Sequence, residues 1–236
     1  MASEQPGAHE ARPSPPEVSS ARLQILATEH WSLLATRSLI YSESFSRVSL
    51  FLTVLTGAVV GLALLAQVGH FNSTFVVAAI LILSVVVFVG VVTVGRLSAL
   101  NRENFFVVEG MNRLRHAYLE MQPDLEKYFV ASGQDDIRGV LLSMGLPRTP
   151  GSASAFTNAF EGLQTLPAMV LVVVALVSGV LAAVIAEAFG ATTGVAIVVG
   201  AITFVAMNIS FGFLAQRAFF RFAKNMAPRF PSADST

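Results

Sequence analysis

Residues that could take part in acid–base chemistry gather just before the first long apolar run. The stretch ATEHWSLLATRSLIYSESFSR, residues 27–47, holds Glu29, His30 and Glu43 among many Ser and Thr hydroxyls. Together with His116, these side chains could serve a membrane-bound enzyme that acts on lipid, because carboxylates and imidazoles transfer protons. On a helix, however, the hydroxyls spread around the surface and imply no partner geometry, so we favour an interfacial role for His30 over that of a catalytic base.

Other reactive or ligand-binding motifs are missing from the sequence. The chain has no Cys, which excludes disulfides, thiolate metal sites and a Cys nucleophile. The spacing of its His residues matches no zinc or di-iron signature, and no phosphate-binding glycine loop or nucleophile elbow occurs. Asp135 and Asp136 lack the spacing of a calcium loop, so we expect them to cap the helix that follows. We therefore predict no catalytic residue, no metal and no cofactor.

The composition is that of a protein dissolved in lipid. Hydrophobic residues make up 54% of the 236 residues and charged residues only 13%, about half the charged share of a soluble domain. Four nearly uncharged runs, at 48–68, 75–95, 166–186 and 192–215, reach the roughly 20 residues that a bilayer-crossing helix needs. The sequence predicts an all-α polytopic membrane protein with four transmembrane helices.

Short links join these runs into two predicted hairpins, residues 48–95 and 166–215. All fifteen Lys and Arg residues lie outside the two links: four precede the first run, seven lie between the hairpins and four follow the last run. Positive charge collects on the cytoplasmic side, which predicts a multi-pass protein of the inner (plasma) membrane with both termini in the cytoplasm. The formal net charge is zero, so we expect a lipid bilayer as partner and no nucleic acid.

The remaining residues are predicted to be cytoplasmic. Residues 1–21 are rich in Pro and Ser and predict a disordered tail, and residues 216–236 form a basic tail. Residues 22–47 predict an amphipathic helix, which either lies on the membrane or extends the first span inward. Residues 96–165 predict a small helical segment, in which the second span continues to Pro123, two short helices follow, and an amphipathic helix spans about 152–164.

The runs also contain residues that suit helix packing or a polar path. Small residues at four-residue spacing let membrane helices approach closely, either within one chain or between chains. The packing candidates are Gly57, Gly61, Gly179, Ala183, Gly190 and Gly194. The candidates for a pore lining or an interhelical hydrogen bond are Asn208, Ser210 and Thr93, with Glu187 at the outer mouth.

Three residues of the segment 22–47 suit the headgroup layer of a membrane. They are Trp31, Arg37 and Arg47, because aromatic rings and cationic side chains favour that depth. We expect this segment to pack against the cytoplasmic extension of the second span.

Two blocks resemble a family of membrane proteins. LATEHWSLLATRSLIYSESFSRVSLFLTVLTGAVVGLALLAQ and MNRLRHAYLEMQPDLEKYF are similar to those of uncharacterised four-helix inner-membrane proteins of actinobacteria and related bacteria, over residues 22–145. That family has no assigned activity, so the resemblance implies a location and no reaction.

These observations predict a non-catalytic integral membrane protein. We expect a homo-oligomer that serves as a channel-like or membrane-scaffold protein, because two hairpins enclose little space and their Gly-rich faces suit partners. The alternatives are an accessory subunit of a larger membrane complex and the lipid-acting enzyme described above.

Overall fold

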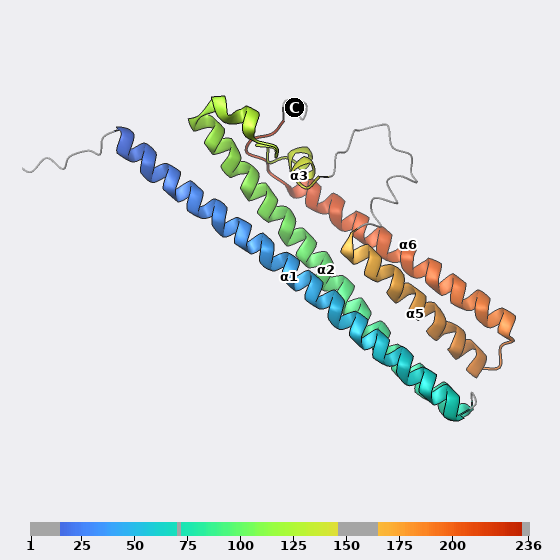
Figure 1. Cartoon of the computed structure of the whole chain (residues 1–236). Helices are drawn as coiled ribbons and strands as arrows, with labels where there is room; N and C mark the ends of the chain where they lie inside the picture. The colour runs from blue at the N-terminus through green and yellow to red at the C-terminus, as the bar shows by residue number, and fades with distance from the viewer. Residues whose placement is uncertain (1–14, 70–71, 146–164, 233–236) are drawn as a thin grey trace, which may run out of the picture.

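The computed structural model describes residues 15–69, 72–145 and 165–232, and these ranges contain helices and no strand. Four long helices, α1 (Pro15–Gly69), α2 (Ser73–Met121), α5 (Leu166–Ala188) and α6 (Thr193–Asn225), are long and apolar enough to cross a membrane. A 3-10 helix, η1 (Pro123–Tyr128), and a short helix, α3 (Ile137–Ser143), follow α2 (Figure 1). The structure thus confirms the prediction of an all-helical chain with four long apolar helices.

Local chemistry explains where the helices begin and end. The Asn72 side chain accepts a hydrogen bond from the Phe75 N–H at 2.9 Å and caps α2. α2 ends at Met121, two residues before Pro123, as predicted. α5 carries Pro167 in its first turn, where Pro is well tolerated. Between α5 and α6 the chain turns at Gly190, whose φ of 86° suits glycine. Its N–H and that of Ala191 bond back to the last turn of α5, which makes a Schellman end.

α1 and α2 run without interruption from their apolar runs into their charged halves. Residues 22–47 are continuous with the first apolar run within one helix of 55 residues, so they extend it. This helix begins at Pro15, which places residues 15–21 in α1 and not in the tail expected there. α2 likewise joins its apolar run to residues 96–121 in one helix of 49 residues. Neither helix is interrupted between its apolar run and its charged half.

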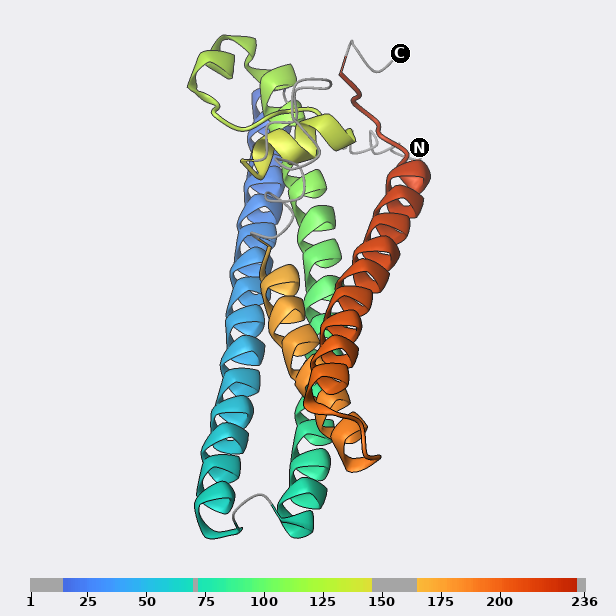
Figure 2. The ribbon, with the colours of Figure 1, turned by 90° about the vertical axis from the view of Figure 1, so that its right-hand side faces the viewer.

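α2 is the central helix and packs through a regular seam. Its buried residues follow steps of four and three from Ala79 to Leu114, namely Ala79, Leu83, Val86, Gly90, Thr93, Leu97, Leu100, Asn104, Val107, Met111 and Leu114. Such a heptad repeat keeps one face of a helix against its neighbours over many turns. α1 lies along α2 over its length (Figure 2). Ile40 and Phe51 of α1 belong to the same buried cluster.

α5 joins the second pair of helices to α2 at two glycine contacts. A Cβ at Gly90 of α2 would lie 2.4 Å from Val174 of α5, so Gly90 leaves the space that Val174 occupies. α5 and α6 cross where Gly179 faces Gly200, because a Cβ at Gly179 would lie 2.7 Å from the Gly200 carbonyl oxygen. The buried row of α2 therefore contacts α1 on one side and α5 on another.

A second, smaller core lies beside the charged half of α2. Phe105 and Val108 of α2 pack there with Val140 and Leu141 of α3. Phe219, Phe222 and Met226 of α6 cover this cluster, and the rings of Phe105 and Phe222 meet edge to face. α6 continues past its apolar run to Asn225, so the first part of the basic segment 216–236 is helical.

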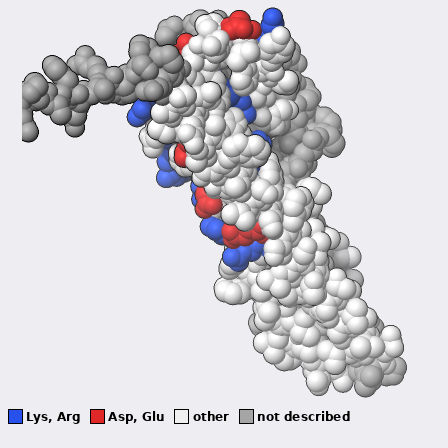
Figure 3. All heavy atoms as spheres, turned by 60° about the vertical axis from the view of Figure 1, so that its left-hand side comes forward, with Lys and Arg blue, Asp and Glu red and all other residues white. Residues whose placement is uncertain are grey.

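Charged side chains gather at one end of the molecule. In Figure 3 the Lys, Arg, Asp and Glu side chains lie along one half, and the surface of the other half is almost free of them. This division matches the switch from apolar to charged sequence within α1 and α2. The amphipathic helix predicted at about 152–164 lies outside the described residues.

Candidate functional site: an aspartate pair that binds the C-terminal segment

Two adjacent carboxylates before α3 bind the backbone of the chain's last described residues. The buried Asp135 carboxylate accepts hydrogen bonds from the N–H groups of Arg229 (2.9 Å) and Phe230 (2.8 Å). The buried Asp136 carboxylate accepts bonds from the N–H of Ser232 (3.0 Å) and from the Ser232 hydroxyl. The pair therefore holds residues 229–232 through main-chain bonds. We call this arrangement the aspartate clasp.

Both aspartates also have partners on the elements that position them. Asp136 accepts a bond from the Gly139 N–H at 2.7 Å and caps α3, as the sequence predicts. Asp135 does not cap α3, and instead accepts a bond from Arg113 Nε of α2 at 2.7 Å. Arg113 also pairs with Glu109, one helical turn earlier, as its i,i+4 spacing indicates. The clasp thus ties α2, α3 and the segment after α6 together.

A fully buried asparagine fixes the loop that carries the clasp. Asn112 of α2 donates from Nδ2 to the Gln134 carbonyl oxygen at 2.7 Å. Its Oδ1 accepts bonds from the Ser143 hydroxyl (2.9 Å) and from Arg115 (2.7 Å). Both polar atoms of the Asn112 side chain have hydrogen-bond partners, so this side chain holds residues 132–143 against α2.

The clasp donors lower the pKa values of both carboxyls. Burial alone raises the pKa of Asp135, but the Arg229 N–H, the Arg113 side chain and the Phe230 N–H outweigh burial. The net result is a pKa below the usual 3.8. Burial acts the same way on Asp136, and bonds from Ser232 and Gly139 again bring the pKa below its usual value. Both groups are therefore ionised acceptors at neutral pH.

A second cluster of charges lies where the apolar runs of α1 and α2 end. Glu43 of α1 accepts two bonds from the Arg96 guanidinium of α2, at 2.9 and 3.1 Å. Arg47 pairs with the same Glu43, and Glu103 pairs with Arg96 at 3.3 Å. The bidentate pair fixes the register of the two helices at the end of their apolar runs.

The residues that suggested acid–base chemistry do not form one site. Glu43 belongs to the charge cluster just described, and Glu29 is exposed. The His30 ring stacks on Tyr118 at 5.9 Å, whereas the His116 ring stacks on Phe230 of the clasped segment at 3.9 Å. Within the described ranges, no three His, Asp or Glu side chains are placed to hold a metal ion.

The candidate pore residues lie on three different helices. Thr93 is buried in α2 and donates to the Val89 carbonyl oxygen. Asn208 of α6 donates to the Phe204 carbonyl oxygen of its own helix, and Ser210 is exposed. Glu187 is exposed at the end of α5. The structure does not bring these side chains together within one chain.

The small residues proposed for helix packing divide into two groups. Gly179 and Ala183 pack within the chain, both against Gly200 of α6. The other four, Gly57, Gly61, Gly190 and Gly194, have no neighbour within 4 Å of the place a Cβ would take. Gly190 has a different role, since it forms the turn between α5 and α6. The sequence did not single out Gly90 or Gly200, although both make the closest helix contacts.

The continuous helix α1 separates the three residues proposed for the headgroup layer. Arg47 directly precedes the apolar run, but Trp31 lies 17 residues before Val48, or about 25 Å along a helix. Arg37 lies between them. A headgroup layer is only several ångströms deep, so one layer cannot contain all three side chains if α1 crosses the membrane. The shared interfacial depth of Trp31, Arg37 and Arg47 therefore stays a prediction, and it requires residues 22–47 to lie along the membrane surface rather than across it.

Comparisons with protein-family models, with curated proteins and with solved structures find no match for this chain. The family resemblance noted in the sequence therefore stays a prediction, and the functional argument rests on the geometry alone.

Proposed function

We propose that this chain is a non-catalytic, multi-pass membrane protein that acts as a homo-oligomeric membrane scaffold. The observation that carries the proposal is the continuity of α1 and α2, each of which joins an apolar run to a long charged half. Such helices hold their two charged halves side by side outside the bilayer, at a fixed position relative to the membrane. The clasp ties the segment after α6 to the charged half of α2, so the part outside the bilayer is linked to both ends of the chain.

The location of the chain follows from its charges. All described Lys and Arg residues lie in the charged halves of the helices or in the segments between them, and none lies in the links after α1 and α5. By the positive-inside rule, both termini and the charged halves of α1 and α2 are cytoplasmic, and the apolar runs cross an inner or plasma membrane.

The use of the ionisable side chains supports a scaffold over an enzyme. Among the charged side chains nearest the boundary, Glu43 of α1 pairs with Arg96 of α2 and with Arg47 of its own helix. The clasp carboxylates bind backbone N–H groups of the same chain. These charged groups already have partners within the chain, so they stabilise its packing through charge-assisted hydrogen bonds.

Two measurements test this proposal. The mass of the protein in detergent or nanodiscs, after subtraction of bound lipid, should be two or more whole multiples of 25.1 kDa. A 25.1 kDa monomer would contradict a homo-oligomer, and a complex of this chain with a different protein would favour the accessory-subunit alternative.

The orientation is tested by labelling single cysteines, since the natural chain has none. Glu29→Cys places a thiol at an exposed position on one predicted side, and Ala191→Cys places one at a partly exposed position on the other. In intact cells whose inner membrane is accessible from outside, a membrane-impermeant maleimide should label Ala191→Cys only. Labelling of Glu29→Cys without lysis would reverse the orientation.

A further inference from the structure

The outer side of α1 carries a second row of apolar residues beside the row that faces α2. The row follows steps of four and three for 36 residues: Ala27, Trp31, Leu34, Ser38, Tyr41, Phe45, Val48, Leu52, Leu55, Val59 and Leu62. We call it the outer row. In the charged half of α1 it is open, with exposed fractions of 70% for Trp31, 41% for Leu34, 42% for Tyr41 and 59% for Phe45.

The spacing of the outer row is that of a helix–helix seam. Alternating steps of four and three let apolar side chains of two helices interlock over many turns. The row facing α2 has the same repeat, offset by one residue, and includes His30, Arg37, Ser44 and Phe51. α1 is therefore built to pack against two helices, and α2 is one of them.

Charge and residue size around the outer row also suit a close helix contact. The five charged residues between 22 and 47 all lie off this row. The positions next to it on the side away from α2 are small, namely Thr28, Ala35, Ser42 and Ser49. Small neighbours let two backbones approach closely, and an uncharged seam adds no repulsion between identical helices.

The place of the outer row identifies its partner. In residues 48–62 of the row, Val48, Leu55 and Leu62 are partly buried against the core of the same chain, and lipid can cover Leu52 and Val59. Residues 27–45 lie in the charged half. Under the proposed function that half is in water, where exposed Trp, Leu, Tyr and Phe side chains favour burial. A partner for the whole row must itself pass from lipid into water in the same register. Of the helices described, α1, α2 and α6 have this character. α2 already has its seam filled, and α6 ends at Asn225, about ten residues past its apolar run, which is too short to cover residues 27–45.

We infer that α1 of a second copy packs in parallel along the outer row, so that two copies join through their α1 helices. This inference rests on the proposed homo-oligomer and on the cytoplasmic location of residues 22–47. The two copies then form a four-helix arrangement of α1 and α2 pairs, continuous with the interface already present in each chain. Burying Trp31, Leu34, Tyr41 and Phe45 of both copies removes roughly 900 Å² from water, judged from the surface of such side chains. This area is below the roughly 1,200 Å² of a standard specific interface, and the exposed Leu52 and Val59 of the row add to it within the membrane.

Disulfide cross-linking in native membranes tests the inference, because the chain supplies no cysteine of its own. Ser38→Cys lies on the outer row and Ser46→Cys lies off it, and both serines are exposed on α1. The pair Leu34→Cys and Leu39→Cys repeats the comparison with larger side chains, and Leu39 is the more exposed of the two at 70%. In a parallel pair, identical seam residues come within the Cα distance of about 6 Å that a disulfide needs.

The expected result is a product of twice 25.1 kDa for Ser38→Cys and Leu34→Cys, formed about tenfold faster than for Ser46→Cys and Leu39→Cys. Equal rates on and off the row would overturn the inference, as would a product that contains another protein. No dimer product at either seam position, with the mass measurement still showing an oligomer, would overturn the α1 contact and leave the proposed homo-oligomer standing. A monomeric mass would overturn both.

Discussion

Removing the Asp135 carboxylate should release the C-terminal segment from the rest of the chain. In Asp135→Ala, the N–H groups of Arg229 and Phe230 and the Arg113 side chain lose their shared acceptor. Net contributions of hydrogen bonds to a charged group are about 1.5–3 kcal/mol each. The total loss is smaller than the sum of these three contributions, because the freed N–H groups can bond to water and Arg113 keeps its pair with Glu109.

We expect a loss of about 3 kcal/mol in the free energy of docking residues 229–232, at the lower end for breaking a buried ion pair. This corresponds to a fall of about 150-fold in the docking equilibrium. Hydrogen exchange, measured by mass spectrometry on a peptide that contains Phe230, reports this change directly. Asp135→Asn keeps one acceptor oxygen and should lose about half as much free energy.

Asp124→Asn is the matched control, since Asp124 is exposed in η1 and the substitution removes the same charge. Exchange at Phe230 should stay as in the natural chain in this variant. If exchange in Asp135→Ala also stays within about threefold of the natural chain, the carboxylate does not hold the segment and the reasoning on the clasp is wrong.

Four further outcomes follow from the structure. Gly200→Val should lower the unfolding temperature through about 1–3 kcal/mol of overpacking at the α5–α6 crossing, whereas Gly57→Ala, with open space around it inside a helix, should not lower it; equal decreases would argue against the crossing. Asn104→Leu removes a buried oxygen without a hydrogen-bond partner from the seam of α2, so thermal unfolding should shift upward by the equivalent of about 1 kcal/mol. Liposomes with the purified chain should show no ion flux above empty liposomes, and flux that disappears in Asn208→Leu would favour a channel. The lowered pKa values of the two clasp aspartates stabilise docking above about pH 3.8, so protection of the C-terminal segment should hold at neutral pH and fall as the pH drops below 3.8; constant protection to pH 2 would contradict the role of the charges.

Features set by neighbouring residues could be predicted from the sequence. The buried row of α2 follows from three- and four-residue steps such as Leu97, Leu100 and Met111, because helical periodicity is a local property. Pro123 marked a helix boundary for the same reason. The Asp136 cap also needed only the start of the next helix.

Contacts between residues far apart in the chain could not be predicted, because they leave no periodic pattern in the sequence. The bond from Arg229 to Asp135 joins residues 94 positions apart, and nothing periodic links an acidic pair to a C-terminal segment. Glycines are frequent in all four apolar runs, so spacing alone did not show that Gly179 would meet Gly200. The wide apolar stripe of residues 22–47 was visible, but only the position of α2 shows that Leu33 is covered and Leu34 is open.

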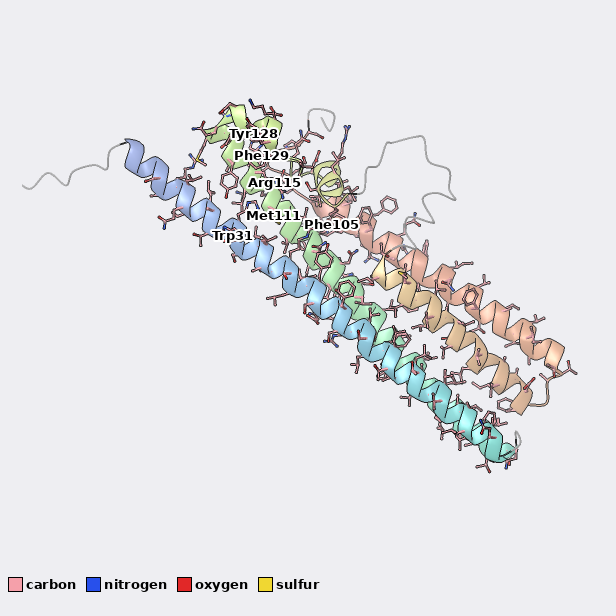
Figure 4. All side chains as sticks on the ribbon, viewed as in Figure 1. Trp31, Phe105, Met111, Arg115, Tyr128 and Phe129 are labelled. Atoms are coloured by element: carbon pink, nitrogen blue, oxygen red, sulfur yellow. The ribbon has the colours of Figure 1, made fainter. Side chains whose placement is uncertain are left out.

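The clasp and the second core bring together α2, α3 and the segment after α6, which lie far apart in the sequence. Figure 4 shows Arg115, Met111 and Phe105 along α2, with Tyr128 and Phe129 beyond its end and Trp31 on α1. Of these residues, Phe105 belongs to the second core.

The absence of a break in α2 makes the helix a lever. Residues 96–121 extend about 39 Å past the apolar run, and the charged half of α1 runs beside them. A helix adjusts its tilt to the thickness of the surrounding bilayer, and a tilt change of about 10° would move the far end of such a lever by about 7 Å. A small change in membrane thickness would therefore become a displacement of several ångströms at the end where η1, α3 and the C-terminal segment meet.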